Sequence, residues 1–230
     1  MLNRAITSAL ITAIVLQPVA PLDRVHAQGS SSVEVVEIAI SNGPKLTGRY
    51  RDAGTGAPGV LLFPMCSDNG EDGWTPLAEQ LHKAGVSSLM VAEAGYSARE
   101  ARGDAALAFL RSRVGPNAPV ALTGGSCGVS LAAGTALRNP EQVRALVLLS
   151  GPHNAPHVEF IRKTPSLAVF SGASDGEPPS PEWARELRNA SANPASHVEI
   201  WTVTAHGTDY FIESPAFAAQ VADWLVKRLK

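Results

Sequence analysis

The sequence lacks a surplus of charge of either sign: its 230 residues carry a formal net charge of −2. A chain that binds nucleic acid needs a strong positive field, so this balance argues against such a partner. Blocks of like charge are also missing, which argues against a charged tail or a membrane-binding patch. We find no internal repeat and no low-complexity tract. With 45% hydrophobic residues, the chain is long enough for one well-buried domain but too short for two full-sized ones.

Cysteine is scarce as well, because the chain has only Cys66 and Cys127. A C-x-x-C motif is therefore absent, and we expect neither a metal site nor a redox motif of that kind. No cysteine lies near the N-terminal cleavage site described next, so a lipid-modified N-terminus is not supported.

The first 27 residues have the pattern of a secretory signal peptide. Arg4 supplies a positive start, residues 5–15 are apolar and uncharged, and Val25-His26-Ala27 is a small-x-small cleavage site. The alternative is a membrane anchor, but the uncharged run contains Pro18 and is only marginally long enough to span a bilayer.

The signal peptide predicts that the protein is secreted or periplasmic, and that the mature chain has no membrane span. Residues 28–32 are a short flexible leader. Residues 33–230 then form one folded domain.

This domain alternates short β-like runs with helical patterns. Such alternation predicts the α/β class, with a mostly parallel twisted sheet, helices on both faces and ligands at the carboxyl ends of the strands. The interval between Ser150 and Pro165 is too short for a large lid. The predicted strands are 33–40, 45–51, 59–63, 86–92, 120–123, 143–150, 166–171 and 197–203, and the predicted helices are 75–84, 98–114, 129–138, 181–190 and 214–229.

Between one predicted strand and the next helix lies the motif Gly124-x-Ser126-x-Gly128. A serine on such a sharp turn stands above the sheet, and bulky residues two positions away on either side would clash, so glycine is needed at both. The turn also places the Cys127 amide at a helix N-terminus, where negative charge is stabilised. The segment therefore predicts a nucleophilic serine. Cys127 is a poorer nucleophile, because the β-branched Val129 suits the equivalent flanking position badly.

A nucleophilic serine needs a base and an acid that orients the base, and in this pattern the acid precedes the histidine in the chain. Asp175 follows the predicted strand 166–171, and His206 follows the predicted strand 197–203. We therefore assign His206 as the base and Asp175 as the acid. Asp209 is close enough in sequence to contact His206 but does not follow a strand of its own, and Asp104 lies inside a predicted helix.

The reaction of such a serine develops an oxyanion, which needs two hydrogen-bond donors. The amide of Cys127 is the first. The second belongs to the loop that begins at Pro64, and because proline has no amide hydrogen the donor is Cys66 or Met65, of which we favour Cys66.

In the order of its elements and in three motifs, the chain resembles the α/β-hydrolase superfamily, and within it the small lidless dienelactone-hydrolase-like group. The motifs are Gly124-Gly-Ser-Cys-Gly128, Gly172-Ala-Ser-Asp175 and Ala205-His-Gly-Thr-Asp-Tyr-Phe211. This resemblance covers almost the whole mature chain and implies hydrolysis of carboxylic esters without a cofactor.

Two departures from that group matter. Dienelactone hydrolases carry a cysteine nucleophile where this chain has Ser126, so their substrate should not be inherited. Pro64-Met65 also replaces the His-Gly pair that is common before the oxyanion loop.

By this resemblance the two cysteines follow the two sides of one oxyanion site. Donors that share an oxygen lie close together, so the Cα atoms of Cys66 and Cys127 are expected within the range of a disulfide. Two buried free thiols are the alternative.

The sequence as a whole predicts a serine hydrolase that cleaves a small-molecule or polymer ester through Ser126, His206 and Asp175. An amide or peptide hydrolase with the same three residues, and a non-catalytic binding protein that keeps the fold, are the alternatives. Nothing in the sequence determines the acyl or alcohol group of the substrate, or the oligomeric state.

Overall fold

The computed structural model describes residues 32–41, 43–67, 72–92 and 99–230. The predicted signal peptide (1–27) and residues 28–31 of the predicted leader lie outside these ranges. Among the residues that the structure describes, no helix is long and apolar enough to cross a membrane.

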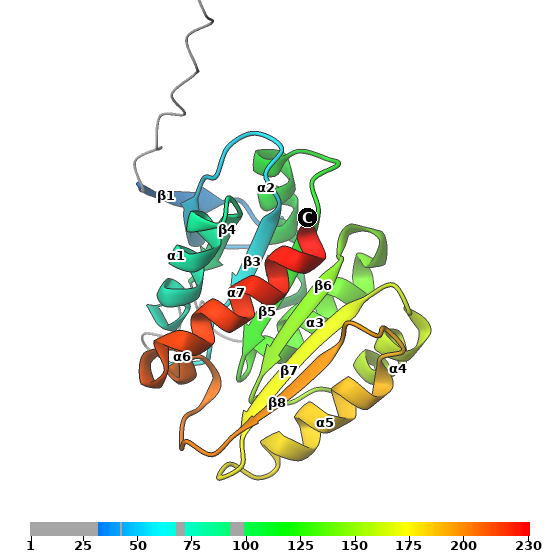
Figure 1. Cartoon of the computed structure of the whole chain (residues 1–230). Coiled ribbons are helices and arrows are strands. Elements are labelled where there is room, and N and C mark those ends of the chain that lie inside the picture. Colours follow the sequence, from blue (N-terminus) through cyan, green and yellow to red (C-terminus); the bar gives the residue numbers. More distant parts are fainter. Residues whose placement is uncertain (1–31, 42, 68–71, 93–98) are drawn as a thin grey trace, which may run out of the picture.

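An eight-stranded sheet forms the centre of the molecule (Figure 1). Its strand order is β1-β2-β4-β3-β5-β6-β7-β8. The β1–β2 and β2–β4 pairs are antiparallel, and all the others are parallel, which confirms the predicted mostly parallel sheet. The strands are β1 (Val33–Ile38), β2 (Leu46–Arg51), β3 (Gly59–Phe63), β4 (Ser87–Val91), β5 (Val120–Gly125), β6 (Ala145–Leu149), β7 (Ala168–Ser174) and β8 (His197–Trp201).

Helices cover both faces of the sheet, as predicted for the α/β class. One face packs against α1 and α7, which lie in front of the sheet in Figure 1, and the other face packs against α2, α3, α4 and α5. The helices are α1 (Thr75–Lys83), α2 (Arg99–Val114), α3 (Gly128–Arg138), α4 (Ala155–Lys163), α5 (Ser180–Ala190), α6 (Tyr210–Glu213) and α7 (Pro215–Leu229).

The burial of the central strands explains their sequences. Every residue of β3, β4, β5, β6 and β7 is buried, because helices cover both faces, and strands in that position are continuously apolar rather than alternating.

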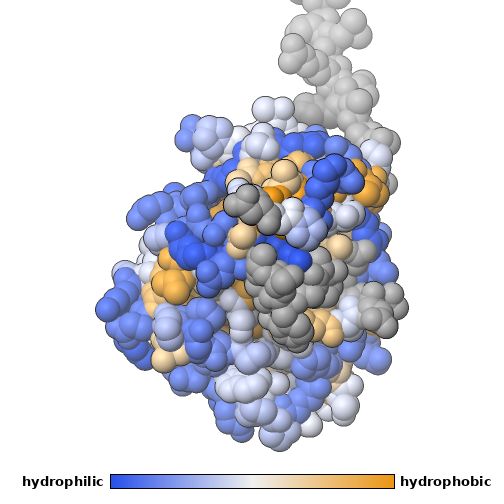
Figure 2. All heavy atoms as spheres, turned by 180° about the vertical axis from the view of Figure 1, so that it is seen from behind, coloured by the Kyte–Doolittle hydropathy of each residue, from blue (hydrophilic) through white to orange (hydrophobic). Residues whose placement is uncertain are grey.

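The outer helices are amphipathic. In α5, for example, Ala184 and Leu187 are buried, whereas Glu182, Arg185 and Glu186 are exposed. The back of the molecule is accordingly hydrophilic over most of its surface, with small scattered hydrophobic patches (Figure 2).

Helix α4 was missed in the sequence. It begins after Asn154, whose side chain accepts a hydrogen bond from the His157 amide at 3.1 Å, and it has Pro156 in its first turn. This short helix occupies the interval between Ser150 and Pro165. In the described part of the chain, this connection therefore holds no large lid.

Two strand ends also differ from the prediction. Strand β7 continues to Ser174, three residues past the predicted end, whereas β8 stops at Trp201, two residues early. The two strands pair up to Ser174 and Trp201, and the Asp175 amide still donates to the Trp201 carbonyl oxygen at 2.8 Å. This extension decides which carboxylate reaches the candidate site.

Candidate active site

The side chains singled out in the sequence gather at the carboxyl ends of the parallel strands. Ser126 follows β5, and His206 lies in the connection after β8. The strand order places β6 and β7 between them. Parallel strands present all their carboxyl ends at one edge of the sheet, so residues distant in sequence meet there.

Ser126 lies on a strained turn between β5 and α3, which we call the elbow. Its φ of 52° is in the left-handed region, which residues other than glycine seldom adopt. A Cβ atom at Gly124 would lie 2.2 Å from the Gly128 carbonyl oxygen, and one at Gly128 would lie 2.6 Å from the Pro64 carbonyl oxygen. Both glycines are therefore required by backbone contacts, as the motif predicts.

We expect Gly124→Ala to damage both stability and activity. The new Cβ must displace backbone rather than a flexible side chain, which costs about 1–3 kcal/mol of unfolding free energy. A displacement of the elbow by about 1 Å would lower kcat/KM about 100-fold. Urea denaturation and ester kinetics measure the two effects.

Gly134→Ala is the matched control, because its added Cβ meets its nearest neighbour, Arg138, at 3.4 Å. In the interior of α3, alanine should stabilise the helix by about 0.5–1 kcal/mol and leave kcat/KM unchanged. Equal losses of activity in the two variants would contradict the steric account of the elbow.

The Ser126 hydroxyl is hydrogen-bonded to the imidazole of His206, with 2.8 Å between Oγ and Nε2. His206 is 43% exposed, so the pair lies at the protein surface and is open to solvent. With a hydrogen on Nδ1, the neutral imidazole leaves Nε2 free to accept the serine proton.

Met65 packs between the elbow and the histidine loop. The Thr208 amide donates to its sulfur at 3.3 Å, and a Cβ at Gly207 would lie 2.3 Å from that sulfur. Gly207 also has a φ of 55°, which favours glycine. Met65 therefore supports the position of the loop that carries His206.

The carboxylate that bonds to His206 is Glu177, not the predicted Asp175. Glu177 Oε1 lies 3.2 Å and Oε2 lies 3.3 Å from His206 Nδ1. Glu177 is 22% exposed, whereas Asp175 is exposed to solvent. The structure thus places Glu177, rather than Asp175, against the imidazole of His206.

The reason is the length of β7. Because the strand runs on to Ser174, Asp175 is still tied by its amide to the ladder with β8. The chain turns only then, with the Glu177 amide donating to the Ser174 carbonyl oxygen at 3.3 Å. This turn brings Glu177 over the sheet edge. A second carboxylate two residues past Asp175 was the signal in the sequence that pointed to it.

Neither Asp104 nor Asp209, the other acids considered in the sequence analysis, contacts the His206 imidazole, and three further histidines lie in other surroundings. Asp104 accepts hydrogen bonds from Arg138 at 3.0 Å and from Asn139 at 2.9 Å, as expected of a helix-face residue. Asp209 is hydrogen-bonded to His206 only through their backbones. His153 and His197 pair with Glu186 and Glu199, and burial lowers the pKa of His157.

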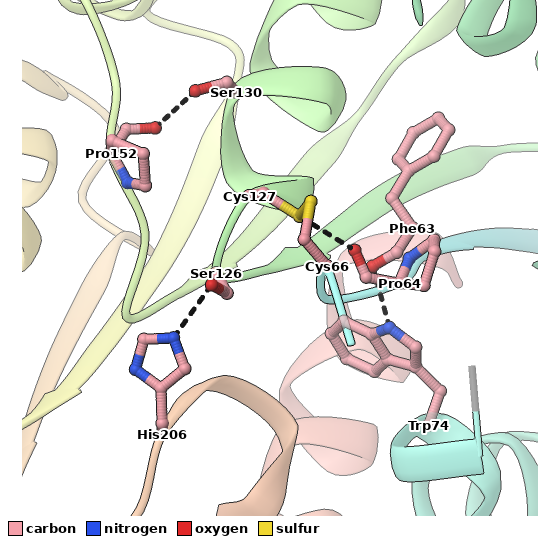
Figure 3. The surroundings of a disulfide bond; sticks show 9 residues. All are labelled: Phe63, Pro64, Cys66, Trp74, Ser126, Cys127, Ser130, Pro152 and His206. Atoms are coloured by element: carbon pink, nitrogen blue, oxygen red, sulfur yellow. Dashed lines mark hydrogen bonds between the residues drawn. A yellow bond between two sulfur atoms is a disulfide. The ribbon is translucent and has the colours of Figure 1, made fainter. Parts of the chain in front are cut away.

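The two predicted oxyanion donors lie side by side. Cys127 is the N-cap of α3, so its amide is among those at the start of a helix that have no intrahelical acceptor. A disulfide joins Cys66 to Cys127, with their Cα atoms 5.8 Å apart, and Figure 3 shows it beside Ser126 and His206. The loop that carries Cys66 continues into residues 68–70, which lie outside the described ranges.

Tyr210 and Ser150 also lie near this edge, although the sequence analysis assigned no role to either of them. Their hydroxyl groups are 3.3 Å apart in the interior, and Ser150 has a φ of 49° directly after β6. Burial raises the pKa of Tyr210 to about 12, with a smaller contribution from the charge of Glu177. The tyrosine is therefore a neutral, buried hydrogen-bonding group close to the carboxylate.

Histidine, cysteine and acidic side chains do not gather into a metal site anywhere in the described ranges, where no group of three or more could hold an ion. The candidate site consists of the Ser126 hydroxyl, the His206 imidazole and the Glu177 carboxylate, joined in series by hydrogen bonds, with the first amides of α3 beside the hydroxyl. This arrangement fits nucleophilic chemistry that uses the chain's own side chains.

No protein-family model and no curated protein matches the sequence. Solved structures do match it. An esterase from Pyrococcus furiosus superposes with a TM-score of 0.66 at 15% identity, covering 86% of this chain and 92% of that one. A dienelactone hydrolase from Anabaena variabilis has a TM-score of 0.66 at 18% identity, covering 86% and 99%. An esterase domain from Rhodothermus marinus has a TM-score of 0.68 at 17% identity, covering 86% and 100%.

The superpositions establish the fold, but at identities this low they leave the activity open. Nearly the full length of each of these chains is matched by the described domain. The strand order, the helices on both faces and these superpositions together show that the chain has the α/β-hydrolase fold, without a large lid in its described part.

Proposed function

We propose that this protein is a serine hydrolase that cleaves carboxylic esters through an acyl-enzyme, with Ser126 as nucleophile, His206 as base and Glu177 as the acid that orients the base. The observation that carries this proposal is the 2.8 Å hydrogen bond between Ser126 Oγ and His206 Nε2 on a strained elbow. A strained backbone at a residue whose hydroxyl is hydrogen-bonded to a base is typical of a reactive site rather than of a packing contact.

The first half of the reaction forms the acyl-enzyme. Ser126 Oγ attacks the ester carbonyl carbon while His206 Nε2 takes the hydroxyl proton, and Glu177 stabilises the imidazolium that results. The amides of Cys127 and Cys66 donate to the carbonyl oxygen as it becomes negative. When the tetrahedral intermediate collapses, His206 returns the proton to the leaving alkoxide, and the alcohol departs.

In the second half, water attacks the acyl-enzyme. His206 accepts a proton from the water and passes it to Ser126 Oγ as the carboxylic acid leaves. Every proton in this cycle moves through one imidazole nitrogen, so the scheme needs no metal or cofactor.

An ester is favoured over an amide as the substrate. The solved structures with the same fold are named as esterases and as a dienelactone hydrolase. The partly exposed His206 and the short connection at α4 fit an open cleft, which suits a small-molecule ester or the exposed ester of a polymer. Since dienelactone hydrolases have a cysteine nucleophile, we do not propose their substrate.

A fluorophosphonate probe tests the proposal. We expect the probe to phosphonylate the protein stoichiometrically, and peptide mapping to place the label on Ser126. A panel of p-nitrophenyl esters and matched p-nitroanilides should show turnover of the esters. Labelling at another residue, or faster turnover of the anilides, would contradict the assignment of the nucleophile or of the substrate class, respectively.

We further propose that residues 1–27 are removed during export, so that the mature protein works in the periplasm or outside the cell. A disulfide beside the nucleophile supports this location, because such bonds persist in oxidising compartments. N-terminal sequencing of the protein recovered from those fractions should begin at Gln28.

A further inference from the structure

The disulfide joins two segments that meet at the nucleophile. One end is Cys127, the residue after Ser126, and the other is Cys66, in the connection after β3 (Figure 3). The two cysteines are 61 positions apart, and strands β4 and β5 and helices α1 and α2 lie between them, so the bond bridges elements that the fold brings together independently.

The chain between β3 and Cys66 is held in place without the disulfide. Trp74 Nε1 donates to the Phe63 carbonyl oxygen at 2.8 Å, in the interior. Pro64 packs against Gly128, where no Cβ would fit, and Met65 accepts from the Thr208 amide through its sulfur. These contacts fix the segment from Phe63 to Met65.

Cys66 lies just past the last of these contacts. Gly59 to Met65 are all buried, whereas Cys66 is exposed. The bond to Cys127 is therefore the covalent attachment of an exposed loop residue to the N-terminus of α3, at the place where the second oxyanion donor is needed.

We propose that the Cys66–Cys127 disulfide is a redox-sensitive positioning element: it holds the Cys66 amide in the oxyanion hole, and its reduction lowers the activity of the folded enzyme. This inference rests on the proposed function, since it concerns the donor for an oxyanion formed at Ser126. It adds that the enzyme reaches its full activity only in its oxidised form.

The exposure of Cys66 makes the reduction chemically accessible. A thiolate of a dithiol attacks one sulfur of the bond and forms a mixed disulfide, and the second thiol of the reductant then displaces the protein sulfur. The dithiol gives up two electrons and two protons and becomes a cyclic disulfide, while Cys66 and Cys127 become free thiols.

Reduction should affect the transition state more than substrate binding. The hydrogen bonds of His206 with Ser126 and Glu177 involve neither cysteine side chain, so we expect these three residues to keep their arrangement after reduction. A displaced donor weakens the interaction with the oxyanion, which exists only after attack. Removing one such donor lowers kcat about 100- to 1,000-fold, and we expect a displaced donor to lower it about 10- to 100-fold with little change in KM.

The test compares oxidised and dithiol-reduced wild-type protein with the double variant Cys66→Ser/Cys127→Ser. Ester kinetics are measured at a temperature where circular dichroism shows all three to be folded. The affinity for a boronic acid, which forms a tetrahedral adduct with the serine, reports the oxyanion interaction separately from KM. Reoxidation after removal of the reductant checks that any loss is reversible.

We expect reduced wild type and the double variant to lose kcat and boronic acid affinity by the same factor. The double variant should not respond to the dithiol, and reoxidation should restore the wild type. Unchanged kcat in the reduced, folded protein would overturn the inference. So would the lack of any assay temperature at which the reduced protein stays folded, because the bond would then serve folding as a whole. If the oxidised protein fails to label at Ser126, the proposed function itself fails, and this inference with it.

Discussion

Replacing Ser126 by alanine should lower kcat about 10⁶-fold, to a level set by whatever the oxyanion donors and substrate binding still provide. The hydroxyl is the only atom that the substitution removes, and the elbow tolerates alanine as well as it tolerates serine. The loss should therefore appear with the melting temperature almost unchanged. A chromogenic ester, assayed after active-site titration to exclude wild-type contamination, measures it.

Ser130→Ala is the matched control for this prediction. Ser130 lies one helical turn further along α3, and its hydroxyl donates to the Pro152 carbonyl oxygen at 2.6 Å. Its loss should cost about 1 kcal/mol of unfolding free energy and leave kcat within about threefold of wild type. If Ser130→Ala were inactive and Ser126→Ala active, the nucleophile would have been misassigned.

The second large effect distinguishes the two carboxylates that follow β7. Glu177→Gln should lower kcat about 10³- to 10⁴-fold, because glutamine neither stabilises the imidazolium nor favours the productive tautomer of His206. Asp175→Asn should leave kcat within about threefold of wild type, since Asp175 is exposed and bound to the sheet through its backbone.

Both substitutions replace a carboxylate by its amide, in one loop and with the same change of charge, so each controls for the other. Thermal melting should show both variants to be folded. A severe loss in Asp175→Asn together with an active Glu177→Gln would return the role to Asp175. That result would mean that the loop rearranges when substrate binds.

The comparison of these two residues shows where reasoning from sequence reaches its limit. The sequence predicted that an acid from the loop after the penultimate strand meets a histidine after the last strand, and the structure shows such a contact. The acid in contact with His206 is Glu177 rather than the predicted Asp175, because β7 ends three residues later than its apolar pattern indicates. Gly172 and Ser174 look like loop residues, but their neighbours in β6 and β8 keep them in the sheet.

The elbow could be read directly from the sequence, because its requirements are local. The motif of Gly124, Ser126 and Gly128 is recognised from residues only a few positions apart, although Gly128 itself is required by the close approach of Phe63 and Pro64. Met65 could not be read in this way. Met65 positions the histidine loop through contacts with Gly207 and Thr208, more than 140 residues away. Nothing near Met65 in the chain indicates these contacts.

The sequence by itself determined the α/β class, the serine on its elbow and the histidine after the last strand. Short-range sterics and hydrophobic patterning decide these features, and both are written into neighbouring residues. Only the tertiary structure decided that Glu177 meets His206, that Met65 supports the histidine loop and that Cys66 is joined to Cys127. Those pairings depend on distances of a few ångströms between distant segments, which strand lengths and packing set together.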